Sequence, residues 1–146
     1  MKMTEIQMDI FSVPQGYYLA QGISRDFDFS VGLPAQFEKV YNMREKLEAI
    51  EADFNECDIE IYVGEAIVVD NVFNLIVKET SYDAPIRGAF LDALSEMKFM
   101  AEHLGVTKIA MPHICCGKNG FEWEQVKALI EFIFYDTDIE ILICSK

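Results

Sequence analysis

The residues best suited to chemistry in this sequence lie together in one short stretch, residues 110–126, with the sequence AMPHICCGKNGFEWEQV. His113, Cys115 and Cys116 could bind a metal ion or supply a nucleophile, and Lys118 adds a positive charge. Glycines follow the cysteines, so the stretch could equally be a loop that binds phosphate. The stretch therefore allows three kinds of site.

A metal centre has the weakest support of the three. Structural zinc sites usually have four ligands, typically with two residues between paired cysteines, whereas Cys115 and Cys116 are adjacent. On an extended strand, His113 and Cys115 share one face while Cys116 points to the other. The remaining cysteines, Cys57 and Cys144, show no pairing pattern. We therefore expect neither a bound metal nor another cofactor.

A cysteine nucleophile is the second possibility. Cys116 would lie near the start of the next helix, where a thiol loses its proton more readily, and His113 or His103 could accept that proton. His103, however, falls on the polar side of a predicted helix. Cysteines also serve as small packing residues, and we favour that interpretation for Cys115 and Cys116.

The loop favours the third kind of site, which binds an anion through its backbone. Gly117 and Gly120 allow the backbone to come close to a ligand. The N–H groups and the positive dipole end of the following helix would point toward a bound phosphate. Such a loop needs no reactive side chain, although many two-glycine turns only connect two elements.

Periodic apolar residues predict the elements that position this loop. Spacings of three and four residues predict helices over residues 34–50, 85–104 and 122–133. Short apolar runs predict strands over residues 3–10, 17–23, 59–63 with 66–69, 71–77, 108–114 and 139–144. Strands that alternate with helices predict parallel pairing and an α/β fold, a three-layer α/β/α sandwich. Ligands of such sheets bind at the carboxyl ends of strands, where residues 110–126 would lie.

Composition narrows the class of protein further. The 146 residues are 51% hydrophobic and 25% charged, as in an ordinary globular protein, and we expect one domain over residues 1–146. The net charge of −13 opposes direct nucleic-acid binding. No apolar run reaches membrane-spanning length, and residues 1–9 do not resemble a signal peptide. We therefore expect a cytoplasmic monomer, without membrane contact and with reduced thiols.

Four segments together resemble the macrodomain family over nearly the whole chain. MPHICCGKNGFEWEQV, residues 111–126, resembles its second phosphate-binding loop, which in the terminal ADP-ribose glycohydrolase subgroup usually follows the pattern M-P-x-I-G-C-G-x-D-x-x-x-W. MDIF (residues 8–11) resembles the family's early strand end, and residues 20–41 resemble the first ligand loop and its helix. LIVKE (residues 75–79) resembles the strand end that carries the subgroup's catalytic lysine. The resemblance implies a mixed, largely parallel sheet between helices, with ADP-ribose in a crevice above it.

The resemblance also implies a set of ligand-binding residues. Asp9 would accept a hydrogen bond from the adenine amino group, with Ile10 beside it. The first loop would surround the distal ribose and diphosphate with Ser24, Ser30, Val31 and Gly32. The second loop would hold the diphosphate through the backbone of Ile114, Cys115, Cys116, Gly117, Lys118 and Asn119. The loops depart from the family pattern, because the first has only one glycine and Cys115 replaces a glycine in the second.

The implied chemistry is removal of ADP-ribose. In the subgroup, a lysine, here Lys78, attacks the anomeric carbon of an ADP-ribosyl ester, and an aspartate assists breakdown of the adduct. That aspartate is Asn119 in this chain, and an amide cannot exchange a proton at ordinary pH. Asp26, Asp28 and Asp83 are possible substitutes.

Three functions remain open from the sequence, and we favour the first of them. The first is a hydrolase that acts on ADP-ribose attached through an ester or another linkage, or on ADP-ribose 1″-phosphate. The second is a non-catalytic reader or sink for ADP-ribose, and the third is a scaffold without a ligand. We expect ADP-ribose or an ADP-ribosylated protein as the partner.

Overall fold

A computed structural model describes residues 1–146, and it confirms the α/β sandwich with a mixed, largely parallel sheet. The six strands are β1 (Lys2–Gln7), β2 (Tyr18–Ser24), β3 (Ala66–Val69), β4 (Val72–Lys78), β5 (Lys108–Met111) and β6 (Glu140–Ser145). They lie in the order β1-β6-β5-β2-β4-β3. All neighbouring strands are parallel except the antiparallel pair β3 and β4. The parallel strands therefore bring their carboxyl ends to one edge of the sheet.

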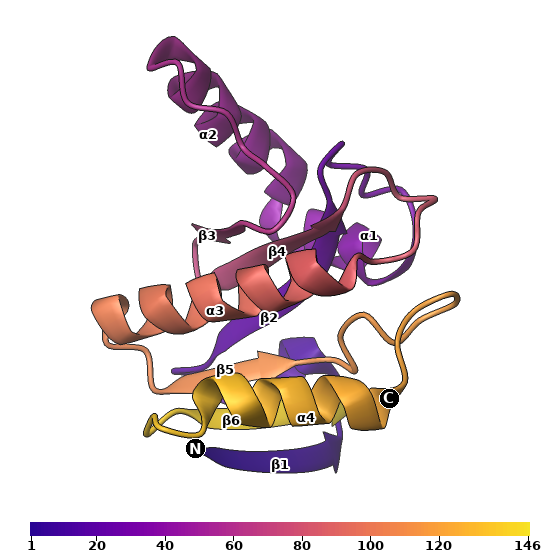
Figure 1. The fold of residues 1–146 in the computed structure, drawn as a ribbon, viewed down its shortest axis with the longest axis vertical. Coiled ribbons are helices and arrows are strands. Elements are labelled where there is room, and N and C mark those ends of the chain that lie inside the picture. Colours follow the sequence, from indigo (N-terminus) through magenta and orange to yellow (C-terminus); the bar gives the residue numbers. More distant parts are fainter.

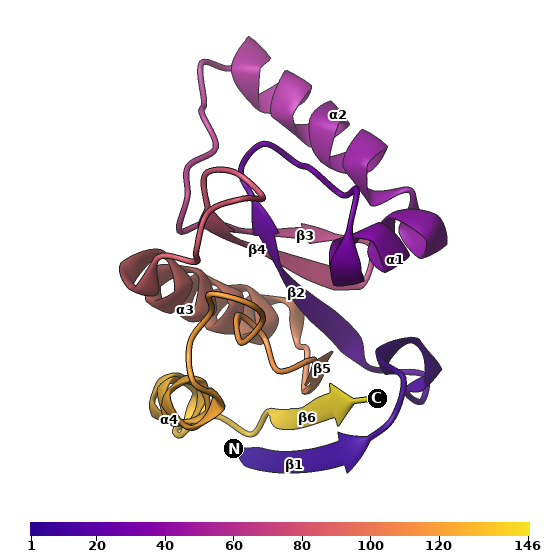
Figure 2. The same ribbon diagram turned by 90° about the vertical axis from the view of Figure 1, so that its right-hand side faces the viewer.

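Helices cover both faces of this sheet. They are α1 (Gly32–Tyr41), α2 (Met43–Glu56), α3 (Arg87–Leu104) and α4 (Trp123–Phe134), with a short 3-10 helix, η1 (Ile10–Ser12). Figure 2 shows α3 and α4 on one side of the sheet and α1 on the other. Phe90 and Ile130 belong to a core cluster on the first side, and Phe37 and Leu47 to a separate cluster on the second. Burying one such side chain contributes about 1.5–3 kcal/mol, so these apolar stripes hold the helices on the sheet.

The helix predicted over residues 34–50 is divided in the structure. Asn42 separates α1 from α2 with a left-handed backbone (φ 55°, ψ 46°), and its N–H donates to the Glu38 carbonyl. Asparagine is one of the few residues that adopt this conformation readily. The chain turns there, and α2 continues toward the β3 edge of the sheet (Figure 1). The apolar spacing continues across the turn, so the sequence pattern did not reveal it.

Three predicted strands were also wrong in extent. The strand predicted over residues 3–10 ends at Gln7, and Ile10 begins η1 instead. Residues 59–63 form no strand; Ile61 is buried in the core, and its carbonyl accepts a hydrogen bond from Arg25 Nε at 2.6 Å. The strand predicted over 108–114 ends at Met111, because Pro112 has no N–H for a sheet ladder. The shorter strand leaves residues 112–122 free to form a loop. None of the four helices has the length and apolar character needed to cross a bilayer.

Candidate functional site

A cleft opens where the carboxyl ends of β2, β4 and β5 meet. In Figure 1, β4 and β5 point toward the right-hand edge, where the connections that follow them lie. Three connections border the cleft: the first loop (residues 25–31), the lysine loop (residues 79–86) and the second loop (residues 112–122). The cleft has a volume of about 330 Å³, and Lys78 from the end of β4 lines it.

A second cavity of about 410 Å³ continues this cleft toward η1. Asp9 and Ile10 line it from the N-terminal side, and Lys146 from the C-terminal side. Four residues line both cavities: Leu33, Pro112, His113 and Gly117. The two cavities therefore form one elongated site, with Lys78 at one end and Asp9 at the other.

Most of the residues predicted from the sequence line this site. The first cavity contains Ser24, Val31, Lys78, Ile114, Cys115, Gly117 and Lys118, and the second contains Asp9, Ile10, Cys116 and Gly117. Three predicted residues, Ser30, Gly32 and Asn119, belong to the same loops but line neither cavity. The sequence did not predict several other lining residues, among them Gln21, Leu33, His113, Ser81 and Lys146. The first three lie within segments that resemble the family, which could have indicated them. Ser81 and Lys146 lie outside those segments and reach the site only through the fold.

Asp9 presents an ionised carboxylate at its end of the site. It caps η1, where Oδ1 accepts the Phe11 N–H at 3.0 Å, and Lys146 Nζ lies 3.4 Å from Oδ2. The Phe11 N–H and the Lys146 ammonium lower the pKa of Asp9. The side chain therefore remains an acceptor, able to receive a hydrogen bond from an amino group on a ligand.

The first loop is held by its own acidic side chains. Asp26 Oδ1 accepts the Ser24 hydroxyl at 2.5 Å and the Asp28 N–H at 3.2 Å. Asp28 Oδ1 in turn accepts the Ser30 N–H at 3.0 Å. Each carboxylate thus binds the N–H two residues further along, which is how aspartate stabilises a turn without glycine.

The second loop is held by backbone hydrogen bonds instead. The Gly120 N–H donates to the Gly117 carbonyl and the Phe121 N–H to the Cys115 carbonyl, both at 2.8 Å. A Cβ on Gly120 would lie 2.3 Å from the Cys115 carbonyl oxygen, so only glycine fits there. Between Cys115 and Phe121, the N–H groups that take no part in the loop's hydrogen bonds are those of Cys115, Gly117, Lys118 and Asn119. Unpaired N–H groups on successive residues are the arrangement that binds anions.

The two adjacent cysteines lie in this loop as unreactive lining residues. Burial raises the pKa of the Cys115 thiol to about 12, although the Lys78 ammonium opposes the shift. Burial and the Glu122 carboxylate raise the pKa of Cys116, whose thiol lies 3.4 Å from the Ile114 carbonyl. Both thiols are therefore protonated at neutral pH and poor nucleophiles. No three His, Cys, Asp or Glu side chains converge to hold a metal ion.

Cys115 occupies a backbone conformation that normally favours glycine. Its φ is 60°, in the left-handed region. Its sulfur packs over Gly22 of β2, where an added Cβ would lie only 3.3 Å from Sγ. The absence of a side chain at Gly22 therefore makes room for the thiol, which explains how the loop accommodates a cysteine at this point.

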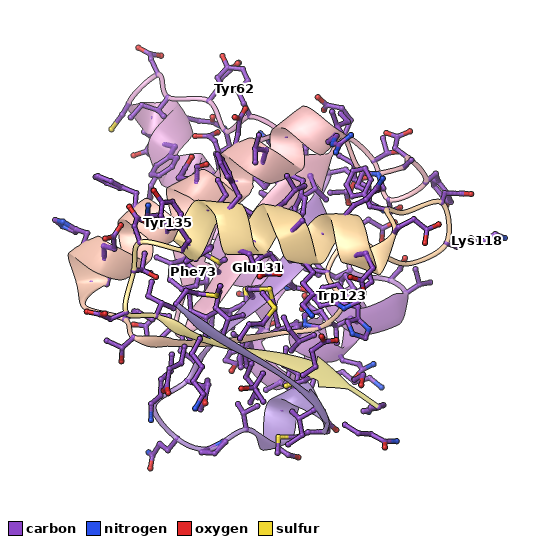
Figure 3. All side chains as sticks on the ribbon, turned by 60° about the horizontal axis from the view of Figure 1, so that its bottom comes forward. Tyr62, Phe73, Lys118, Trp123, Glu131 and Tyr135 are labelled. Atoms are coloured by element: carbon purple, nitrogen blue, oxygen red, sulfur yellow. The ribbon has the colours of Figure 1, made fainter.

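The two lysines of the cleft differ in placement. Lys78 is partly buried, and its Nζ donates to the Ser81 carbonyl of the lysine loop at 3.2 Å. Lys118 lies at the rim, and Figure 3 shows its side chain extending outward from the second loop. Lys78 is thus the amine inside the cleft, whereas Lys118 contributes a cation at its mouth.

Trp123 fixes the far end of the second loop. Its indole N–H donates to Glu5 Oε1 of β1 at 3.0 Å, and its ring lies 4.5 Å from the imidazole of His113 between centroids. Lys127 binds the other oxygen of Glu5 at 3.1 Å. Figure 3 shows Trp123 at the first turn of α4. The start of α4 is thereby tied to the sheet edge and to a residue that lines both cavities.

Solved structures with the same architecture define the class of protein. The macrodomain of Thermus aquaticus DarG superposes with a TM-score of 0.82 at 17% identity, over 99% of this chain and 98% of that one. Thermosipho africanus DarTG in complex with ADP-ribose superposes with a TM-score of 0.77 at 15% identity, over 99% of this chain and 42% of that one. The fold is therefore that of a macrodomain.

One sequence relative makes the assignment specific. The chain is 30% identical over 142 residues to ADP-ribose glycohydrolase OARD1 of Homo sapiens, a match that covers 97% of this chain and 90% of that protein. No protein-family model matches the chain. The relative and the shared fold together show that the chain belongs to the macrodomain family, as its loops indicated.

Proposed function

We propose that this protein binds ADP-ribose or an ADP-ribosyl group in the elongated site and hydrolyses an ADP-ribosyl bond at the Lys78 end. One observation carries the proposal: Asp9, the unpaired N–H groups of the second loop and Lys78 follow one another along a single cleft. A nucleobase, a diphosphate and a ribose follow one another in the same order in ADP-ribose. The human relative, by name, is an ADP-ribose glycohydrolase.

The chemistry of each part supports this orientation. Asp9 can accept from the exocyclic amino group of adenine, and the unpaired N–H groups of Cys115, Gly117, Lys118 and Asn119 can surround the diphosphate. Gln21 lines the Lys78 end, where its buried Nε2 donates to Asn74 Oδ1 at 2.9 Å. Backbone donors suit an anionic ligand in a protein with a net charge of −13, because they attract phosphate locally.

The proposed reaction uses Lys78 as the nucleophile. Its neutral amine attacks C1″ of an ADP-ribosyl ester, and the C1″–O bond breaks with its electron pair leaving on the carboxylate. Water then attacks C1″, the C1″–N bond breaks, and the amine of Lys78 recovers its electron pair. The water proton passes to the amine, and its release to solvent restores the neutral amine of Lys78.

A reader of ADP-ribose is the second candidate function. Asn119 stands where the subgroup has its aspartate, and it lies exposed outside both cavities. Its amide cannot act as an acid or a base, and loss of such a group typically slows a reaction by about 10²- to 10⁴-fold. A protein that binds ADP-ribose tightly and cleaves slowly would serve as a sink or a reader.

Calorimetric titration with ADP-ribose tests the proposal first. We expect the wild type to bind and Asp9→Ala to bind about tenfold more weakly, because a charge-assisted hydrogen bond is lost. Asp53→Ala, which removes an exposed acid of α2, should bind like the wild type. Absence of binding in the wild type would overturn the proposal.

Hydrolysis of an ester-linked ADP-ribosylated protein then separates the two functions. We expect Lys78→Ala to bind ADP-ribose but to lose cleavage, and Asn119→Asp to cleave faster than the wild type. A wild type that binds but leaves every ADP-ribosylated substrate intact would support the reader instead.

A further inference from the structure

A chain of hydrogen bonds joins Lys78 to the first loop. Lys78 Nζ donates to the Ser81 carbonyl at 3.2 Å, and the Ser81 hydroxyl donates to Asp28 Oδ2 at 2.6 Å. The second oxygen of Asp28 accepts the Ser30 N–H at 3.0 Å. Lys78, Ser81 and Asp28 all line the 330 Å³ cavity. The amine, the lysine loop and the first loop are therefore connected at the end of the cleft where the bond would be cleaved.

Asp28 is the acid that the fold brings to this end. Asp26 and Asp83, the other two candidates from the sequence, line neither cavity. Asp26 accepts the Ser24 hydroxyl, and Asp83 Oδ2 accepts the Thr80 N–H within the lysine loop. The hydrogen bonds from Ser81 and Ser30 lower the pKa of Asp28, with Arg44 adding a smaller effect. Asp28 thus carries a fixed negative charge at neutral pH and is a strong acceptor.

We propose that Asp28 is a positioning residue, which holds Ser81 so that the Ser81 carbonyl orients the Lys78 amine toward the anomeric carbon. This inference rests on the proposed function and deepens it. A neutral amine has two N–H groups and one lone pair. When one N–H is fixed on the Ser81 carbonyl, the lone pair has fewer directions available, which favours attack on a ligand in the cavity.

The two parts of Ser81 have separate tasks, so they can be tested separately. Its backbone carbonyl contacts Lys78, and its hydroxyl contacts Asp28. Ser81→Ala removes only the hydroxyl, whereas Ser81→Thr retains it. Asp28→Asn would not interrupt the contacts, because its oxygen can accept the Ser30 N–H while its amide N–H₂ donates to the Ser81 hydroxyl oxygen. Asp28→Ala removes both acceptor oxygens and breaks both contacts.

Covalent trapping of Lys78 measures the orientation of the amine directly. The open-chain form of ADP-ribose carries an aldehyde at C1″, which condenses with the Lys78 amine to an imine and releases water. Cyanoborohydride then transfers hydride to the imine carbon, a solvent proton joins the nitrogen, and a stable secondary amine results. Peptide mass spectrometry quantifies the modified Lys78, and calorimetry measures ADP-ribose affinity in the same variants.

At saturating ADP-ribose, we expect Ser81→Ala and Asp28→Ala to trap about tenfold more slowly than the wild type, with affinity changed less than about threefold. Ser81→Thr should trap at nearly the wild-type rate. The variant that combines the Ser81 and Asp28 substitutions should trap no more slowly than either single variant, because each substitution already breaks the same hydrogen bond between Ser81 and Asp28. Ser95→Ala, which removes an exposed hydroxyl bonded only to the Leu91 carbonyl of α3, is the matched control.

The outcomes separate this inference from the proposed function. Equal trapping in Ser81→Ala and the wild type, or equal slowing in Ser81→Thr and Ser81→Ala, would overturn the role of Asp28 while ADP-ribose binding stands. A wild type that binds ADP-ribose without trapping at Lys78 would also overturn it. A wild type that does not bind ADP-ribose would overturn both. If thermal unfolding shows that Asp28→Ala is not folded, the Ser81→Ala and Ser81→Thr pair decides alone.

Discussion

The first and second loops face each other across the cleft but are built on different principles. Asp26 and Asp28 brace the first loop by accepting N–H groups from its own backbone. The second loop braces itself through carbonyls, with Gly120 in its tightest contact. A loop that binds phosphate through its backbone must leave some N–H groups without an acceptor inside the loop. A loop that contributes side chains to a site, like the first loop, can pair all of its N–H groups internally.

This difference explains the low glycine content of the first loop. Its sequence includes Ser30 and Val31 before the single Gly32, which has a φ of 68° at the start of α1. The carboxylates of Asp26 and Asp28 supply the turns that glycines would otherwise supply. The departure from the family pattern is therefore a change in how the loop is stabilised, and it introduces a charged group into the cavity.

The largest effect should come from breaking the backbone bracing of the second loop. Gly120→Ala would force a Cβ against the Cys115 carbonyl oxygen, at a cost of about 1–3 kcal/mol in strain. We expect ADP-ribose affinity to fall about 10- to 100-fold in calorimetry. Gly88→Ala, which meets no atom within 4 Å, is the control and should bind normally. Unchanged affinity in Gly120→Ala would show that the loop does not hold the ligand.

A smaller effect should follow from removing a brace of the first loop. Asp26→Ala leaves the buried Ser24 hydroxyl and the Asp28 N–H without their acceptor. Because Asp26 itself is exposed, we expect a loss of about 1 kcal/mol in the free energy of unfolding, measured in urea. ADP-ribose affinity should fall less than in Gly120→Ala. If Asp26→Ala weakened binding more than Gly120→Ala, the proposed division between the loops would be wrong.

The smallest effect should be a pH-dependent shift of backbone amide signals in NMR spectra. We expect this shift in the first loop, which carboxylates stabilise, and not in the second. The pKa of Asp28 is lowered on folding, so its contribution to stability is present above the ordinary aspartate pKa, near 4, and is lost as the pH falls through its folded pKa. The Ser30 amide signal in ¹H–¹⁵N spectra should therefore titrate with a midpoint below the ordinary value.

Two controls sharpen this titration. The Phe121 amide, whose acceptor is the Cys115 carbonyl, should not follow the same midpoint. Ser81→Ala should raise the midpoint at Ser30, because the hydroxyl that stabilises the Asp28 carboxylate is lost. A Ser30 midpoint at or above the ordinary aspartate value would contradict the bracing described for the first loop.

The sequence predicted the parts of this molecule that depend on local patterns. Alternating strands and helices gave the layers and the parallel pairing, and the second loop was placed correctly between β5 and α4. The turn at Asn42 was not predictable, because the apolar spacing continues through it into α2. Residues 59–63 alternate like a strand, yet Arg25, distant in sequence, satisfies the Ile61 carbonyl.

The same limit applies to the site. Asp9, Lys78 and the second loop could be predicted from the resemblance, because each lies in a recognisable segment. Asp28 was one of three candidate acids, and only the fold distinguishes it, since Ser81 lies 53 residues away in sequence. Contacts of this kind depend on how β2 and β4 pair, which no local pattern specifies.

The packing of Trp123 on His113 has a practical consequence in spectroscopy. The chain contains one tryptophan, and its neighbour lines both halves of the cleft. Intrinsic emission on excitation of the indole therefore arises from a single fluorophore beside the site. Ligand binding in the cleft of the unlabelled protein should therefore change the wavelength and intensity of the indole emission. Trp123→Phe, which lacks this emission, is the control.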